Sequence, residues 1–293
     1  ASDMRLTGLR PENPVAMMAA YGTLRLLPGA RLRWADTHPE LDWDGDILAA
    51  LAKQLPQRLT APEITQLDDP REKNIGGVAG YRALAKTTPH EWLSAYACET
   101  AGGIVKTDLE LFGGQHKFVV LARKHMQALI KMNLIDKIEE ALLGPWRYED
   151  AAQAWGWDAA MRLDAASLPL KASSAHKPGV LGAYWLAWES LPLWLMINGR
   201  TLGFAHIKGE GWCWQYPTSG EWLSWDGLKA LVWGLPRMPE HEQQALRVRV
   251  WTAPVLATNP FGKELGLARI WSRGQGSGGS RRQQAIERPA IEP

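Results

Sequence analysis

The pattern of hydrophobic and polar positions changes part-way along the chain. Before residue 145, apolar residues recur in several segments at helical spacing, whereas beyond Trp146 short apolar runs are separated by turn residues. Helical spacing is typical of amphipathic helices and short bounded runs are typical of strands. We therefore expect an α+β protein, with a helix-rich amino-terminal half and a mixed or antiparallel sheet with helices in the carboxyl half. The regions predicted are 4–145, 146–271 and a disordered basic tail over 272–293, which lacks any apolar pattern.

Capping and turn signals mark the element ends in the first region. Asn13 followed by Pro14 is typical of a helix start, because proline at the first helical position loses no needed N–H. Residues 67–82 are polar and glycine-rich, which predicts a loop. The other elements expected there are helices over about 14–27, 45–54 (capped by Asp44 and stopped by Pro56), 89–98, 114–132 and a short one ending at Gly144, and a strand over 30–36.

The second region alternates predicted strands with two predicted helices. Asn198-Gly199 lies between apolar runs and is a signal of a β-hairpin. The expected strands cover 193–197, 203–207, 211–217 and 247–253, and the expected helices cover 182–191 and 225–233.

Tryptophan is over-represented, with 16 tryptophans against 4 phenylalanines, and most of them lie in the second region. Two interpretations stay open. The rings fill a core, as large aromatic side chains usually do, or they form a surface on which bases or sugars stack.

Charge and cysteine content narrow the class of protein. The tail from residue 272 contains four arginines and two glutamates, which account for the whole formal charge of +2. The body is therefore neutral, and attraction to a polyanion requires local basic patches. Two cysteines exclude a disulfide framework, and we expect Cys98 and Cys213 to be buried thiols. Without a long apolar run or a signal-peptide pattern, we expect a soluble cytoplasmic protein with no membrane association.

The densest acidic segment, ADTHPELDWDGD, suggests a metal site. A calcium loop fails here, because counting from Asp42 places glycine fourth and Lys53 twelfth. An irregular site using His38 and a solvated acidic turn with capping roles both stay open. The sequence contains no Gly-x-Ser-x-Gly elbow, Walker loop or dinucleotide fingerprint, so we predict no catalytic residue and no cofactor.

The segment FGGQHKFVVLARKHMQALIK, residues 112–131, predicts a helix with one acid-free basic face. On a helical wheel the opposite arc, which runs from Phe118 to Met132 through His125, faces the core. Lys117, Lys124 and Lys131 are spaced seven residues apart, which separates them by roughly 10 Å along a helix. This spacing suits successive phosphates of a nucleic-acid strand. The glycine pair exposes the N–H groups of the helix start, which also favour a phosphate. The predicted nucleic-acid-binding residues are Gly114, Gln115, His116, Lys117, Arg123, Lys124, Gln127 and Lys131; a merely solvated face is the alternative.

A second predicted contact lies in the polar loop PREKNIGGVAGYR. Lysine and asparagine read base edges and glycines let the backbone approach a groove. The candidates are Arg71, Lys73 and Asn74, against an ordinary flexible loop.

Three segments, residues 8–27, 112–123 and 143–158, resemble the large-subunit group of CRISPR type I systems, subtype I-G (formerly I-U), in a short form. The resemblance covers about half the chain in patches. It touches Gly114, Gln115 and Phe118 at the helix start, and Gly144, Pro145, Trp146, Trp157 and Asp158 further on. The chain departs from the group by being short for a large subunit, with little room for a carboxyl-terminal helical bundle.

The resemblance implies a non-enzymatic subunit of a crRNA-guided surveillance complex. Its partners are then the crRNA, target double-stranded DNA and other effector subunits, with contact near the protospacer-adjacent motif and the 5′ end of the guide. Two alternatives remain: a tryptophan-rich module that binds carbohydrate or another small ligand, and a metal-dependent enzyme built around His38.

Overall fold

The computed structural model describes residues 3–66, 77–111, 118–151, 155–160, 178–259 and 262–271. Within these ranges helices pack beside small antiparallel sheets, so the expected α+β class is confirmed. The helices are α1 (Pro14–Leu26), α2 (Ile47–Leu59), α3 (Pro62–Thr65), α4 (Gly77–Leu84), α5 (His90–Tyr96), α6 (Phe118–Leu129), α7 (Leu134–Leu143), α9 (Leu181–Glu189), α10 (Trp225–Gly234) and α11 (Glu240–Ala245), with 3₁₀ turns η1 (Leu191–Leu193) and η2 (Leu235–Arg237). The strands are β1 (Met4–Arg5), β2 (Arg31–Ala35), β3 (His38–Asp42), β4 (Ala97–Thr100), β5 (Gly103–Lys106), β6 (Asp150–Ala151), β7 (Pro178–Gly179), β8 (Met196–Ile197), β9 (Arg200–Thr201), β10 (Phe204–Ile207), β11 (Gly211–Ser219), β12 (Val248–Asn259), β13 (Gly262–Leu265) and β14 (Arg269–Ile270).

Helices α1 and α9 form the centre of the fold. Every residue of α9 is buried, and Arg25 is the one position of α1 that is not. A helix that is apolar all round requires partners on all sides, which these two helices find in each other and in their neighbours. A Cβ at Gly22 would lie 1.7 Å from the carbonyl oxygen of Leu186, so glycine is required where the two backbones cross.

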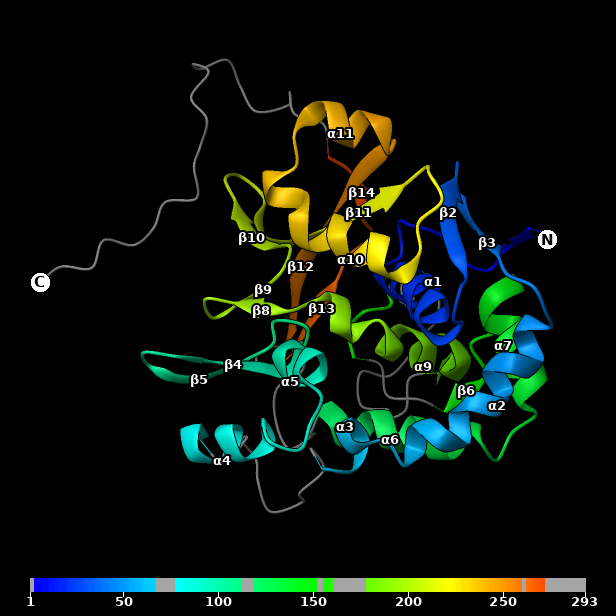
Figure 1. Cartoon of the computed structure of the whole chain (residues 1–293), viewed down its shortest axis with the longest axis horizontal. Helices are drawn as coiled ribbons and strands as arrows, with labels where there is room; N and C mark the ends of the chain where they lie inside the picture. The colour runs from blue at the N-terminus through cyan, green and yellow to red at the C-terminus, as the bar shows by residue number, and fades with distance from the viewer. Residues whose placement is uncertain are drawn as a thin grey trace, which may run out of the picture.

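The other elements lie around this helix pair (Figure 1). Helices α6 and α7 pack against α9, and α2 packs against both of them. On another side lies an antiparallel sheet in the order β10-β11-β12-β13, with β14 also paired to β12. A second sheet, β1-β3-β2, is joined to the segment after β11 by backbone hydrogen bonds between Leu32 and Leu223, both of 2.9 Å. One hydrophobic core therefore includes residues from both regions expected from the sequence.

Most tryptophans fill this core. The ring centroids of Trp155 and Trp157 lie 4.7 Å apart, and Trp188 lies 4.9 Å from Phe118. The tryptophans buried in the structure are Trp34, Trp92, Trp155, Trp157, Trp185, Trp188, Trp194, Trp214 and Trp251. The core interpretation is therefore correct for these rings, and only the less buried ones are placed to stack on a ligand.

The first and last segments that carry the family resemblance pack against each other. The N–H of Val15 donates to the carbonyl of Trp157 at 3.1 Å, and Asn13 Nδ2 donates to Asp158 Oδ1 at 2.9 Å. Asn13 does precede the first turn of α1, but its side chain does not cap the helix. It donates to Asp158 and accepts from the N–H of Ala159 instead. These motifs hold the helix start in place and have a structural role here.

Several expected boundaries were wrong because of contacts distant in sequence. Helix α2 is capped by Asp46, whose side chain accepts from the N–H of Ala49 at 3.0 Å, and it continues through Pro56 to Leu59. The ion pairs of Arg58 with buried carboxylates hold that last turn in place.

The expected loop 67–82 is helical from Gly77 onward. Contacts with β4 stabilise α4, since Arg82 Nε donates to Glu99 at 3.0 Å and Tyr81 donates to the carbonyl of Ala97 at 3.3 Å. Residues 67–76 lie outside the described residues.

Smaller differences concern strands and a cysteine. Only Met196–Ile197 of the expected strand 193–197 forms a ladder, in the hairpin that turns at Asn198-Gly199 as expected. The first half also contains strands β1 to β5, so sheet is not confined to the second half. Cys213 is buried as expected, whereas Cys98 is only half-buried, because β4 belongs to a two-stranded ribbon.

Candidate nucleic-acid interface

The predicted interface is described only in part. Arg71, Lys73, Asn74, Gly114, Gln115, His116 and Lys117 lie outside the described residues. Arg123, Lys124 and Gln127 lie on α6, and Lys131 follows it.

Helix α6 is amphipathic in the expected sense. Phe118, Leu121, His125 and Met126 are among its buried residues, packed towards α9 and the tryptophan cluster. His125 lies 4.6 Å from the ring of Trp155, so it occupies the core as expected.

The opposite face of α6 carries the predicted basic residues. Lys124 and Gln127 are exposed and Arg123 is half-buried, which leaves a polar stripe in solvent while the apolar face fixes the helix. Because the buried face of α6 is fixed in the core, the backbone that carries these polar side chains is held in one position. A rigid backbone favours a binding contact of fixed geometry.

The expected register beyond Leu129 was wrong. Helix α6 ends at Leu129, and residues 130–133 turn into α7, where the side chain of Asn133 accepts from the N–H of Asp136. Ile130 and Met132 are consequently at the surface, each 36% exposed, instead of facing the core. Lys131 is exposed in the turn, so its distance from Lys124 does not follow a helical seven-residue rise.

Among the described helices near this face, α3 and α7 carry the acidic side chains. Neither α6 nor the neighbouring α2 contains an Asp or Glu. On α7, Glu140 and Asp136 both bind Arg147 Nη2, at 2.8 Å each. Burial raises the pKa of Glu140, but hydrogen bonds from Arg147 and Lys137 outweigh burial and lower it, so this carboxylate is ionised and engaged. Among the described residues, α6 and α2 therefore supply no carboxylate for Lys124 and Lys131, and the exposed Glu139 lies on α7.

The acidic segment proposed for a metal forms a strand. Glu40 and Asp42 on β3 pair across the ladder with Arg33 and Arg31, and His38 Nδ1 lies 2.9 Å from the carbonyl oxygen of Leu9. In the described part of the chain no three His, Cys, Asp or Glu side chains are grouped as a metal would require. The interpretation as an acidic turn was wrong for 38–42, because paired arginines on β2 stabilise an extended conformation.

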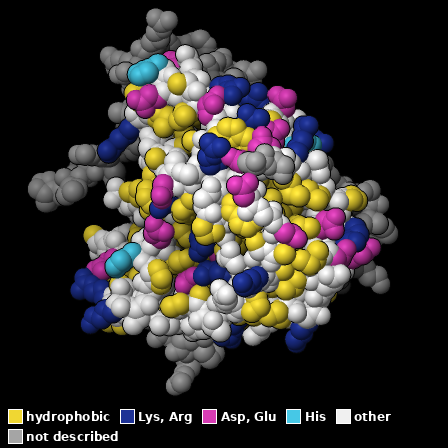
Figure 2. Space-filling model, turned by 45° about the vertical axis from the view of Figure 1, so that its right-hand side comes forward, with side chains coloured by type: hydrophobic (Ala, Val, Ile, Leu, Met, Phe, Trp, Pro, Cys, Tyr) yellow, Lys and Arg dark blue, Asp and Glu magenta, His cyan; other side chains and the backbone are white. Residues whose placement is uncertain are grey.

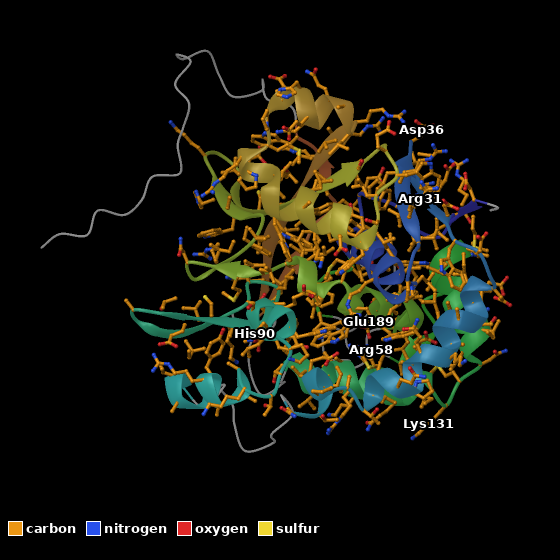
Figure 3. The ribbon with its side chains drawn as sticks, viewed as in Figure 1. Arg31, Asp36, Arg58, His90, Lys131 and Glu189 are labelled. Atoms are coloured by element: carbon orange, nitrogen blue, oxygen red, sulfur yellow. The ribbon has the colours of Figure 1, made fainter. Side chains whose placement is uncertain are left out.

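A buried ion cluster lies inside the helical layer, where Figure 3 shows Arg58 and Glu189 close together. Arg58 Nε lies 3.0 Å from both carboxylate oxygens of Glu189 and also pairs with Glu63, while Arg25 lies 3.4 Å from Glu189. Burial would lower the pKa of Arg58, but the two carboxylates raise it above its ordinary value. Two positive and two negative side chains cancel, so the cluster holds α1, α2, α3 and α9 together.

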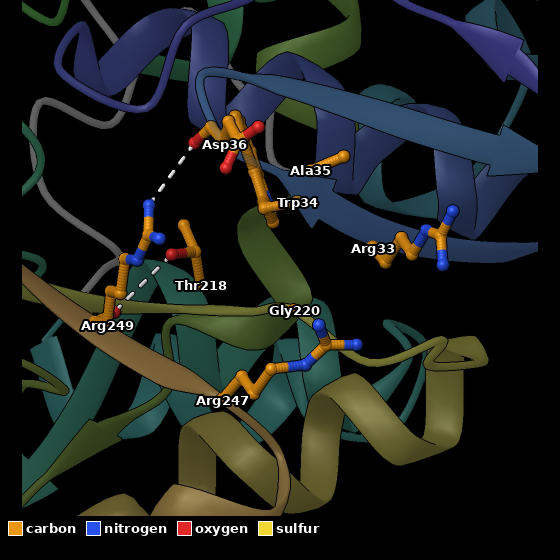
Figure 4. Close-up of a pocket in the computed structure, with 8 residues that line it drawn as sticks. All are labelled: Arg33, Trp34, Ala35, Asp36, Thr218, Gly220, Arg247 and Arg249. Carbon is orange, nitrogen blue, oxygen red and sulfur yellow. Dashed lines mark hydrogen bonds between the residues drawn. The ribbon is translucent and has the colours of Figure 1, made fainter.

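Sequence reasoning missed a cleft at the surface, which we call the arginine cleft and define by Arg33, Arg247 and Arg249 (Figure 4). Its arginines alternate with apolar residues in RLRW (31–34) and RVRV (247–250), so Arg33 on β2 and Arg249 on β12 lie on the opposite face from their apolar neighbours. That alternation was a usable signal, but only the fold brings the two strands together. Figure 2 shows basic and acidic side chains interspersed over most of one face, so local arrangement matters more than net charge.

Comparison with known proteins gives no family for the chain: no protein-family model and no curated protein matches it. Among the described helices, none has the length and apolar character needed to span a membrane.

Proposed function

We propose that this protein is a non-enzymatic nucleic-acid-binding subunit of a CRISPR type I crRNA-guided surveillance complex, working in the cytoplasm. The proposal joins two arguments, one from the surface of α6 and one from the resemblance of three segments to the subtype I-G large-subunit group.

The observation that carries the proposal is the solvent face of α6. Lys124 is exposed on a helix whose other face is buried, and Lys131 extends the positive charge into the next turn. Ordinary exposed helices mix both signs of charge, because opposite charges at i, i+4 stabilise them. A helix without acids, beside a second helix without acids, instead suits a polyanion.

The resemblance supplies the biological setting of this contact. It implies that the polyanion is the crRNA or target double-stranded DNA, bound near the 5′ end of the guide and the protospacer-adjacent motif, beside other effector subunits. The residues of the resemblance that the structure describes, such as Trp157 and Asp158, support the fold, so the contact is assigned to Arg123, Lys124, Gln127 and Lys131 instead.

The test is the salt dependence of binding by a double variant, Lys124→Ala with Lys131→Ala. Binding of a labelled duplex by the full chain is measured between about 50 and 200 mM salt. If each lysine meets a phosphate, the slope of log K against log salt becomes shallower by about two.

The matched control is Lys86→Ala with Lys208→Ala, which removes the same charge from exposed sites elsewhere. An unchanged slope in the α6 variant, or an equal change in the control, contradicts the assignment of the contact to α6.

A further inference from the structure

The arginine cleft lies where two sheets diverge. Strand β2 is hydrogen-bonded at Leu32 to Leu223, and beyond this bridge its end separates from β11 and β12. The gap encloses about 280 Å³ and is lined by Arg33, Trp34, Ala35, Asp36, Thr218, Gly220, Arg247 and Arg249. This volume is just below the roughly 300 Å³ at which small-ligand sites begin, so it limits the ligand to about one nucleotide unit.

Three arginine side chains line this gap: Arg33 on β2, Arg247 just before β12 and Arg249 on β12. Arg33 Nε donates to Glu40 at 2.8 Å and its Cζ lies 4.5 Å from the ring centroid of Trp222. Arg247 Nε donates to Glu221 at 2.6 Å. Each guanidinium has five N–H donors, so one carboxylate orients the group and leaves further donors for a ligand.

Arg249 differs from these two arginines. Its Nη1 donates to the carbonyl oxygen of Asp36 at 3.4 Å, and no carboxylate in the described part of the chain lies within ion-pair distance of it. An exposed guanidinium fork without a carboxylate partner is suited to a phosphate.

The backbone around the cleft is held in uncommon conformations. Asp36 and Arg247 have φ angles of 52° and 48°, and Arg247 follows helix α11 at a position where glycine is usual. A Cβ at Gly220 would lie 2.8 Å from Cβ of Arg247. Glycine at this position therefore leaves room for Arg247 where the chain leaves β11 and returns to β12. The φ of Asp36 is that expected in the two-residue turn between β2 and β3, so these conformations shape the cleft wall.

The lining also contains a hydrogen-bond acceptor. The carboxylate of Asp36 repels a phosphate placed beside it but accepts from an amino group, as on cytosine. A lining with arginine forks and one carboxylate therefore suits a nucleotide, which carries both a phosphate and an amino-bearing base, better than a free phosphate.

From this geometry we infer that the arginine cleft binds one nucleotide unit of a single strand, with the phosphodiesters on the two sides of that nucleotide on Arg247 and Arg249. The inference rests on the proposed function and adds a second contact, separate from α6. Figure 3 shows Arg31 and Asp36, beside the cleft, far from Lys131.

The test measures binding of a labelled 20-nucleotide oligocytidylate to the full chain by fluorescence anisotropy. Arg247→Ala with Arg249→Ala is expected to raise the dissociation constant about tenfold and to flatten the salt slope by about 1.4, the value for two phosphate contacts on a single strand. The matched control, Arg10→Ala with Arg237→Ala, removes two exposed arginines elsewhere and is expected to change both quantities less.

A site-specific readout uses phenylglyoxal modification mapped by mass spectrometry. The oligocytidylate is expected to protect Arg249 and not the exposed Arg237, and inorganic phosphate at the same nucleotide-equivalent concentration is expected to protect neither. Equal protection of Arg249 by polyglutamate identifies an acidic protein partner and overturns the inference.

The outcomes of the two sets of variants separate the two proposals. If only Lys124→Ala with Lys131→Ala loses binding, the proposed function is supported and nucleotide binding by the arginine cleft is contradicted. If only Arg247→Ala with Arg249→Ala loses binding, the contact assigned to α6 is contradicted. Absence of binding by the unmodified chain to both duplex and oligocytidylate at about 50 mM salt overturns both.

Discussion

Two regions of this molecule place arginine against tryptophan, and they differ in how the charge is balanced. In the buried cluster, Arg25 and Arg58 lie 4.9 Å and 5.3 Å from the ring of Trp92, and Glu63 and Glu189 neutralise them. In the arginine cleft, Arg33 covers Trp222, but Arg249 has no carboxylate partner in the described structure. Arginines therefore stabilise the fold where carboxylates neutralise them, and Arg249 is the cleft arginine that no described carboxylate neutralises.

The largest expected effect concerns the buried cluster. Arg58→Ala leaves the buried carboxylates of Glu63 and Glu189 without their main partner, and we expect a loss of about 3–5 kcal/mol in the free energy of unfolding. Urea unfolding followed by circular dichroism measures it. A loss below about 1 kcal/mol, as is typical of exposed ion pairs, contradicts a structural role.

The buried carboxyl group of Asp158 differs from both regions, because its hydrogen-bond partners in the described structure are neutral groups. Burial raises its pKa, although Asn13 and Tyr184 donate hydrogen bonds to it at 2.9 and 3.2 Å. Between the ordinary aspartate pKa of about 4 and the raised value, the folded chain keeps a proton that the unfolded chain releases. This contribution to stability is complete below about pH 4 and is lost as the pH rises through the raised pKa.

We therefore expect the difference in unfolding free energy, wild type minus Asp158→Asn, to fall as the pH rises from about 4 to 7, by at most about 1.4 kcal/mol per unit. Denaturant titrations at several pH values measure this. A difference that stays constant or grows with pH contradicts the raised pKa.

The smallest expected effect comes from Gly220→Ala. The added Cβ meets Cβ of Arg247 at 2.8 Å and displaces its guanidinium without changing any charge. We expect the dissociation constant for the oligocytidylate to rise about threefold with an unchanged far-ultraviolet circular dichroism spectrum, equivalent to about 0.7 kcal/mol. Binding equal to the wild type shows that the position of Arg247 is unimportant.

Local signals were enough to locate many elements of the fold. Asn13-Pro14 marks the start of α1, and Asn198-Gly199 marks the turn of the β8-β9 hairpin, because both depend on backbone preferences of adjacent residues. The apolar spacing also identified the buried face of α6 up to Leu129.

Structural features that depend on contacts between residues far apart in the sequence were not predictable from local signals. Strand β3 depends on Arg31 and Arg33 pairing with Asp42 and Glu40, and the sequence of β3 alone suggested an acidic turn. The arginine cleft joins positions more than 200 residues apart, as the hydrogen bond from Arg249 to Asp36 shows. The spacing of polar and apolar residues within one strand cannot predict that two such distant segments lie together.

The most direct test of this account compares salt slopes in three forms of the full chain. The control variant Lys86→Ala, Lys208→Ala, Arg10→Ala, Arg237→Ala removes the same charge from exposed sites elsewhere, and we expect its nucleic-acid slope to stay close to that of the wild type. The quadruple variant Lys124→Ala, Lys131→Ala, Arg247→Ala, Arg249→Ala is expected to lose about three units of slope. A quadruple variant with the wild-type slope, while the chain still binds nucleic acid, contradicts the claim that these exposed cations form the binding surface.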